Sequence, residues 1–225
     1  MRKSIISIFA VLFLIAGISP VLNAQKAFKG VVTYEITYPG VEVDPMMQAQ
    51  LPTFMTFTMK DNMGKMEMAT GMYTQGEVID AEAKMLTTFI EAMGQKFKIV
   101  MDEEMIKEKK SATPKPEITQ TGDMKEIAGY QCKMAQVVMS LENGETFETE
   151  VFYSEDLNSP AMDFNNEFEG LGGFPFEYTM GMGQINMKFT VKSVKKGGVK
   201  SSDFELAEDY QLVTEDQLKQ MFGGM

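Results

Sequence analysis

The stretch MTFTMKDNMGKMEM, residues 55–68, decides the fold class of this chain. Its apolar residues occupy alternate positions on both sides of a polar Asp-Asn break: Met55, Phe57, Met59, Met66 and Met68. Alternation at period two is typical of a strand with one apolar face, and a short polar break is turn chemistry. The stretch therefore predicts a β-hairpin.

The same alternation recurs outward from this hairpin in both directions. Strands are predicted at 30–38, 77–80, 84–90, 95–101, 131–141, 145–153, 176–182 and 185–194. Asn143-Gly144 lies between two of them and is the strongest short hairpin signal that a sequence offers. About ten strands joined by hairpins predict a mainly β (α+β) fold built on an antiparallel sheet. Such a sheet must close, pair with a second sheet or curl around helices to protect its edges.

Few segments depart from this pattern. The charged run 102–110 is compatible with a helical turn, 111–116 reads as an exposed connector with Pro114 and Pro116, and 154–173 reads as a long acidic solvated loop. Near the C-terminus, Thr214 and Gln217 form a capping box, and Gly223 ends the short apolar stripe of Leu218, Met221 and Phe222. A short C-terminal helix is predicted there.

The first 24 residues have the layout of a secretory signal peptide. Arg2 and Lys3 precede an apolar run from Ile5 to Ile18, and cleavage is expected after Ala24. The run is too short for a membrane span, and no cysteine follows it to carry a lipid anchor. The expected mature chain is one domain, 25–225, located in the periplasm or secreted, and it is not an integral membrane protein.

Composition excludes several functional classes. Removal of Arg2 and Lys3 leaves 19 lysines against 32 Asp and Glu residues, a formal charge of −13, with no arginine. Nucleic acid is not an expected partner, because phosphate binding needs clustered cations. The chain has no histidine and one cysteine, Cys132, so His-based triads and ordinary zinc sites are excluded. We expect a protein that is not an enzyme and that has no cofactor.

Two further features have simple interpretations. Cys132 is a free thiol that cannot form an internal disulfide, and we interpret it as a buried small apolar residue. Asp163, Asn165 and Glu167 have the spacing of a calcium loop, but Phe168 replaces the turn glycine and Phe174 replaces the closing glutamate. That mismatch favours a solvated loop.

Methionine is the most unusual component, with 22 residues in the chain. One interpretation is core packing, since methionine is a flexible substitute for leucine. A second is an adaptable hydrophobic cavity on one concave face of the sheet. A third is a soft-metal site for Cu(I) at Met63, Met66 and Met68, because thioethers select soft ions. In a strand, however, Met63 points away from the other two.

Three segments in this order resemble a known family: KEIAGYQCK at 125–133, VFYS at 151–154 and GLGGFPFEY at 170–178, followed by SDFEL at 202–206 and Asp209-Tyr210. Together they resemble a family of exported bacterial proteins of unknown function (the DUF4412 type), which is related to the GLPGLI proteins. The resemblance implies an architecture similar to the LolA/LppX/RseB half-barrel, a curved antiparallel sheet with helices on its concave side. It also implies a cavity that accepts acyl chains. Carriers of that type hold their lid with an arginine, which the mature chain lacks.

The leading hypothesis is a non-enzymatic exported protein that binds a lipid or other hydrophobic small molecule in the concavity of the sheet. The residues expected to line this site are Met55, Phe57, Met59, Met66, Met68, Phe97, Ile99, Met101, Met187 and Phe189. The alternatives are the Met-rich Cu(I)-binding protein and a cell-envelope protein that docks a protein partner through 154–173.

Overall fold

The computed structural model describes residues 27–41, 50–112, 114–140, 146–182 and 185–222. Three predicted features lie outside these residues: the signal peptide at 1–24, the turn at 142–144 and the helix stop at Gly223. Within the described part, no helix has the length and apolar character that crossing a bilayer requires.

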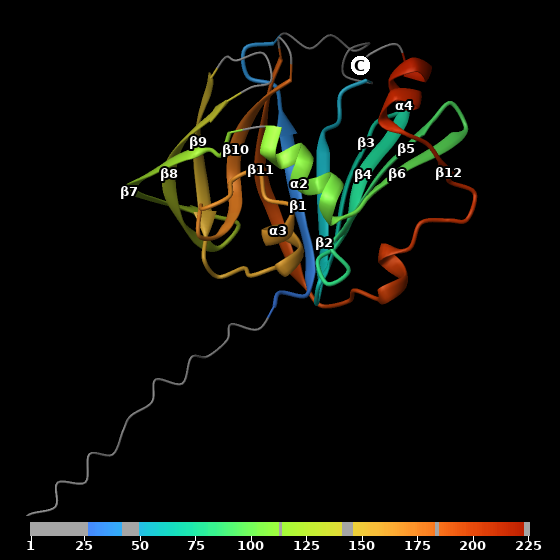
Figure 1. Ribbon diagram of the computed structural model, residues 1–225. Helices are drawn as coiled ribbons and strands as arrows, with labels where there is room; N and C mark the ends of the chain where they lie inside the picture. Colours follow the sequence, from blue (N-terminus) through green and yellow to red (C-terminus); the bar gives the residue numbers. More distant parts are fainter. Residues whose placement is uncertain (1–26, 42–49, 113, 141–145, 183–184, 223–225) are drawn as a thin grey trace, which may run out of the picture.

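One sheet of twelve strands forms the molecule, in the order β12-β6-β5-β4-β3-β2-β1-β11-β10-β9-β8-β7. The strands are β1 Gly30–Thr37, β2 Phe54–Lys60, β3 Met63–Ala69, β4 Tyr73–Asp80, β5 Met85–Ala92, β6 Gln95–Met101, β7 Glu117–Ile127, β8 Tyr130–Ser140, β9 Thr146–Ser154, β10 Phe174–Met182, β11 Ile185–Lys196 and β12 Gln211–Leu212. Two antiparallel meanders, β1 to β6 and β7 to β11, are joined where β1 pairs with β11. The sheet curves without closing (Figure 1), which confirms the predicted half-barrel fold.

The helical elements are short: α2 Glu103–Ala112, α3 Pro160–Phe164, the 3₁₀ turn η1 Ser201–Phe204 and α4 Glu215–Phe222. Both α2 and α3 lie within the curve of the sheet (Figure 1). The predicted capping box of α4 is confirmed, because Thr214 N donates to Gln217 Oε1 at 2.9 Å and Gln217 N donates to Thr214 Oγ1 at 3.2 Å.

The hairpin predicted at 55–68 forms β2 and β3. Met55 lies opposite Met68, and Phe57 lies opposite Met66. Asp61 makes the turn with a φ of 53°, a left-handed conformation that aspartate tolerates.

Two strands were not predicted, so the estimate of about ten strands is corrected to twelve. The edge strand β7 is exposed on both faces along nearly its whole length, and it therefore lacks the apolar alternation that marks a half-buried strand. A bulge between Gln120 and Met124 also interrupts it. The other strand, β12, has only two residues and pairs in parallel with β6.

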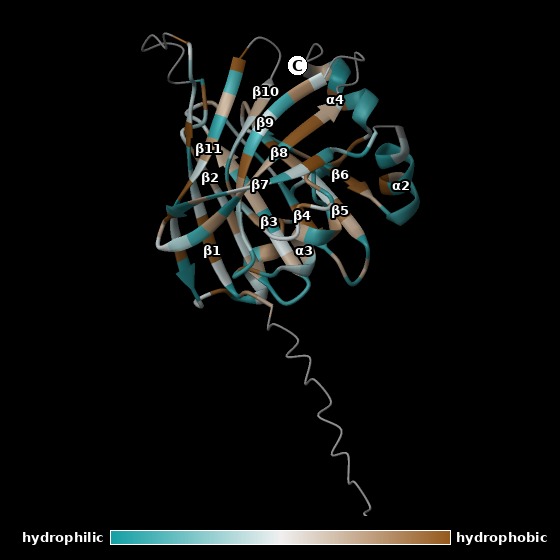
Figure 2. Ribbon diagram, turned by 90° about the vertical axis from the view of Figure 1, so that its left-hand side faces the viewer, coloured by the Kyte–Doolittle hydropathy of each residue, from teal (hydrophilic) through white to brown (hydrophobic). Residues whose placement is uncertain are grey.

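Each face of the sheet carries its own apolar cluster. Hydrophobic and hydrophilic residues alternate in bands along the strands (Figure 2). The main core lies on the inner face and extends over both meanders. On the outer face, Val199, Phe204 and Tyr210 of the chain after β11 pack on Val78 and Phe89. This C-terminal strap, 197–212, then reaches the edge of the sheet, where β12 covers β6.

Candidate functional site

The strand register places the predicted ligand-lining residues on the inner face of the sheet. One row of cross-strand neighbours runs through Met59, Gly64, Ile79, Leu86 and Met101. Cross-strand neighbours share a face. Ala161 of α3 packs against Gly64, so this row faces the inside of the curve.

The other meander contributes to the same face. Phe189 of β11 stacks on Tyr178 of β10 with ring centroids 4.9 Å apart, and Tyr178 meets the ring of Phe168 edge to face at 5.1 Å. All ten residues predicted for the site share this inner face: Met55, Phe57, Met59, Met66, Met68, Phe97, Ile99, Met101, Met187 and Phe189.

Burial divides these ten residues into two groups. Seven are buried in the core: Met55, Phe57, Met59, Phe97, Ile99, Met101 and Phe189. The other three, Met66, Met68 and Met187, are half-buried and lie against the core. The three half-buried methionines and their neighbours therefore form the accessible part of the inner face.

The connection between β9 and β10, which we name the inner segment (residues 155–173), fills part of the concavity. Leu157, Ala161, Phe168 and Leu171 are all buried in the main core. The expectation of a solvated loop here is wrong for these residues. Their spacing follows no helical or strand period, so the sequence gives no sign of their burial.

The start of α3 fixes the inner segment against the sheet. Ser159 caps the helix by accepting a hydrogen bond from Met162 N, and Pro160 occupies the first helical turn. The small side chain of Ala161 then fits over Gly64, where an added Cβ would come within 2.8 Å of Ala161 Cβ.

Polar contacts hold the rest of the inner segment. Asn165 Nδ2 donates to Glu77 Oε2 of β4 at 2.9 Å, and Lys110 Nζ of α2 donates to the carbonyl oxygen of Phe164 at 2.7 Å. Lys115 pairs with Glu169 at 2.6 Å. The two side-chain pairs and the carbonyl contact attach the inner segment to β4, to α2 and to the chain that follows α2.

Two carboxyl groups face each other where the inner segment meets β4. Burial raises the pKa of Glu77, while Lys109 and the Asn165 hydrogen bond oppose that increase. Desolvation and the Glu77 carboxylate raise the pKa of Glu167 to about 7. Since Glu167 as a whole residue is exposed, water screens part of this repulsion.

Beyond the inner segment, half-buried methionines lie toward one end of the inner face, on four different strands, and two of them are cross-strand neighbours. β3 and β8 finish at Ala69 and Ser140, and β10 and β11 meet at Met182 and Ile185. At this end, the upper one in Figure 1, lie four half-buried methionines of the inner face: Met68, Met139, Met180 and Met187. We call them the methionine end.

Sequence reasoning included Met68 and Met187 in the site but omitted Met139 and Met180. Met180 lies directly opposite Met187, and Met139 lies opposite Phe147. The alternation on either side of the turn predicted at 142–144 contained the signal for Met139, because positions equally distant from that three-residue turn, 139 and 147, are expected to be cross-strand partners.

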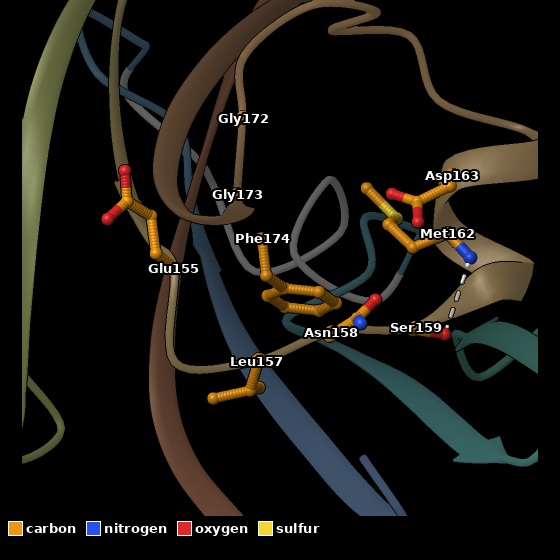
Figure 3. Close-up of a pocket in the computed structure, with 9 residues that line it drawn as sticks. All are labelled: Glu155, Leu157, Asn158, Ser159, Met162, Asp163, Gly172, Gly173 and Phe174. Carbon is orange, nitrogen blue, oxygen red and sulfur yellow. Dashed lines mark hydrogen bonds between the residues drawn. The ribbon is translucent and has the colours of Figure 1, made fainter. Parts of the chain in front are cut away.

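Two of the cavities in the described part of the chain lie near β9 and β10. One, of about 240 Å³, lies along the inner segment and is lined by Glu155, Leu157, Asn158, Ser159, Met162, Asp163, Gly172, Gly173 and Phe174. Figure 3 shows the ring of Phe174 at its centre, with Met162 and Asp163 projecting from α3. The other, of about 310 Å³, lies between β9 and β10 and is lined by Phe147, Glu148, Thr149, Glu150, Phe152, Glu177, Tyr178, Thr179, Asn186 and Lys188. Neither is lined by any of the ten predicted residues.

The alternative soft-metal residues are divided between the two faces. Met63 packs against the outer cluster, whereas Met66 and Met68 pack against the inner core. The structure does not bring these three thioethers together. In the described residues, no group of three or more Asp, Glu or Cys side chains has an arrangement that could hold a metal ion.

Cys132 is fully buried, and its Sγ donates a long contact of 3.6 Å to the carbonyl oxygen of Tyr130. Burial raises the pKa of the thiol to about 11. A thiol of that pKa carries almost no thiolate at neutral pH and is a poor nucleophile.

Comparison with known protein families and with curated proteins finds no match to this chain. Among solved structures, the chain is similar to that in the crystal structure of LprF from Mycobacterium bovis, with 12% identity and a TM-score of 0.32, over 76% of this chain and 88% of that one. A similarity this low carries no argument about function. The half-barrel fold rests on the strand order and the curvature described above.

Proposed function

We propose that this chain is a non-enzymatic binding protein that holds a lipid acyl chain or a similar hydrophobic small molecule at the methionine end of the half-barrel. The observation that supports this most is the half-buried cross-strand pair Met180 and Met187 on the inner face, with Met68 and Met139 half-buried toward the same end of other strands. Unbranched thioether side chains repack around ligands of varied shape.

Binding would occur above the inner segment, which occupies the rest of the concavity. Each buried methylene contributes about 0.8 kcal/mol, so a chain of about ten methylenes contributes about 8 kcal/mol before the costs of ordering. Micromolar affinity needs about that much. A longer acyl chain, or added headgroup contacts, is therefore needed to offset the cost of association.

We also propose that the chain is exported as a single domain. Residues 1–24 act as a signal peptide, the domain spans 25–225, and the protein belongs to the exported family that its sequence resembles. No catalytic role is proposed, because the sequence has no histidine and its one thiol is buried with a raised pKa.

The test combines native mass spectrometry with binding of a fluorescent fatty acid. The mature protein, purified without detergent, should carry a heterogeneous set of lipid-sized adducts. Met180→Gln with Met187→Gln should weaken probe binding by about tenfold or more, because two amide groups would face the ligand. The matched control is Met93→Gln at an exposed turn, which should bind as the wild type does. A bare mass together with no probe binding would contradict the proposal, and a copper adduct would favour the soft-metal alternative.

A further inference from the structure

The exposed apolar side chains of this protein are mostly of one chemical kind. In the part of the chain that the structure describes, eight large apolar residues are exposed, and six of them are methionines: Met72, Met85, Met93, Met105, Met124 and Met221. The buried core is the reverse, because Met55, Met59 and Met101 are the only methionines among its described apolar residues. Methionine is ordinarily one of the residue types most often buried. Core packing therefore does not explain why this chain has so many.

Met93 shows most clearly that the fold does not need these side chains. Its side chain is 88% exposed, so it buries almost no apolar surface. Its φ is 54° and that of Gly94 is 74°, so the turn between β5 and β6 has two successive left-handed residues. That geometry favours asparagine and glycine, and any other residue costs backbone strain. A methionine at this position gives folding no compensating gain.

The six exposed methionines are spread over the molecule. Met72 and Met93 adjoin the last pair of the β4–β5 ladder. Met85 lies at the other end of β5, and Met124 lies in β7, at the far edge of the sheet. The remaining two belong to α2 and α4. A protein partner would contact one surface, whereas these side chains are presented on several, so docking does not account for them.

The property that these positions share is an accessible thioether. Its sulfur carries no proton, so it reacts with two-electron oxidants without activation by a base. Other readily oxidised groups are absent or sheltered. The chain has no tryptophan and no histidine, and its one thiol, Cys132, is buried with a raised pKa. An oxidant that reaches the surface therefore meets methionine sulfur first.

We propose that the exposed methionines consume two-electron oxidants such as hypochlorous acid, so that the protein acts as a sacrificial oxidant scavenger. The sulfur gives up two electrons and bonds to the oxygen of hypochlorous acid. The O–Cl bond breaks, chloride leaves and the proton passes to water. The product is methionine sulfoxide, which methionine sulfoxide reductases return to the thioether. This function is separate from the ligand binding proposed above.

The fold tolerates the reaction because of where the six side chains lie. A sulfoxide is polar and disrupts a core, but at an exposed position it remains in water. Met124 is an example, because it lies beside the bulge of an edge strand that is exposed on both faces. An added oxygen there displaces no packed side chain.

The test uses limiting hypochlorous acid at pH 7, with the mature protein and an equimolar reporter peptide that contains one methionine. The protein should lower oxidation of the peptide about fivefold or more, because six accessible thioethers compete with one. Peptide mapping by mass spectrometry should find the six exposed methionines oxidised and Met55, Met59 and Met101 intact. The circular dichroism spectrum should not change.

The decisive variant replaces all six thioethers at similar side-chain volume: Met72→Leu, Met85→Leu, Met93→Leu, Met105→Leu, Met124→Leu and Met221→Leu. It should keep the fold, as measured by circular dichroism, and lose most of the protection. The matched control is Met55→Leu with Met101→Leu, which removes buried thioethers and should protect the peptide as the wild type does. The inference is overturned if the sixfold variant protects as well as the wild type. It is also overturned if the core methionines of the wild type are oxidised as quickly as the exposed ones.

Discussion

Ala161 of α3 lies directly over Gly64 of β3, and no side chain larger than hydrogen fits at position 64 without displacing α3 or the ring of Phe57. This contact joins the inner segment to the sheet beneath it. It therefore sets the depth of the concavity that remains above.

We expect Gly64→Val to destabilise the protein by about 2 kcal/mol, the usual cost of overpacking a filled interior. Urea unfolding followed by circular dichroism measures this loss. Ala69→Val, on the same strand but exposed, is the matched control and should change the free energy of unfolding by less than about 0.5 kcal/mol. Equal stability of Gly64→Val and wild type would show that α3 does not pack tightly on β3.

Glu167 should make the protein more stable as pH falls from about 7 toward 4.5. Its folded-state pKa of about 7 lies above the ordinary value of 4.5, so the folded state binds more protons in that interval. Glu167→Gln should therefore be more stable than wild type at pH 8, and the difference should shrink as pH falls and be lost below about 4.5 in thermal unfolding. Glu117→Gln on the exposed edge strand is the control, and an unchanged pH profile in Glu167→Gln would refute this assignment.

The buried carboxylate of Glu177 depends on its lysines. Burial raises its pKa, but hydrogen bonds from Lys125 and Lys188 outweigh burial and lower the pKa below 4.5. Lys125→Met should cost about 1 to 2 kcal/mol at pH 7, because it removes two hydrogen bonds of 2.9 and 3.0 Å from a buried charge. Since the folded pKa is lowered, this contribution is lost as pH falls through it.

The control for Glu177 is Lys133→Met. Lys133 pairs with Glu155 at 2.8 Å, but both side chains are about half exposed, so we expect a loss of less than about 1 kcal/mol. Equal losses in the two variants would mean that burial of Glu177 contributes nothing.

Cys132 should resist alkylation in the folded protein. Iodoacetamide at pH 8 should leave the native thiol unmodified over hours and modify it quickly in urea, because burial raises its pKa to about 11 and removes access. Mass spectrometry reads the modification. Rapid native labelling would show that β8 opens around this residue.

The sequence predicts the fold where burial is one-sided. Met55, Phe57 and Met59 alternate because one face of β2 is in the core, and this alternation is visible in the sequence. The edge strand β7 has no such face, and β12 exists only through its contact with β6. Neither has a local signal.

The candidate site also has features that the sequence could predict and features that it could not. Register follows from hairpins, so the shared face of Met55, Met66 and Met68 could be predicted. The burial of Leu157 and Phe168 could not, because it depends on contacts with strands far away in the sequence. The early end of the ladder between β9 and β10, at Phe152 and Glu177, could not be predicted either, since it leaves no mark in the composition of the two strands.

The pairing of β1 with β11 has a consequence for the order of assembly. Gly30 pairs with Lys196 and Thr37 with Lys188, so the central seam of the sheet joins positions at least 151 residues apart. Contacts of such long range make folding slow, because a large loop must be closed before they form. As the chain emerges from its N-terminus, β1 can gain its second neighbour only after β11 has emerged. The two meanders therefore become one domain only once β11 is available to pair with β1.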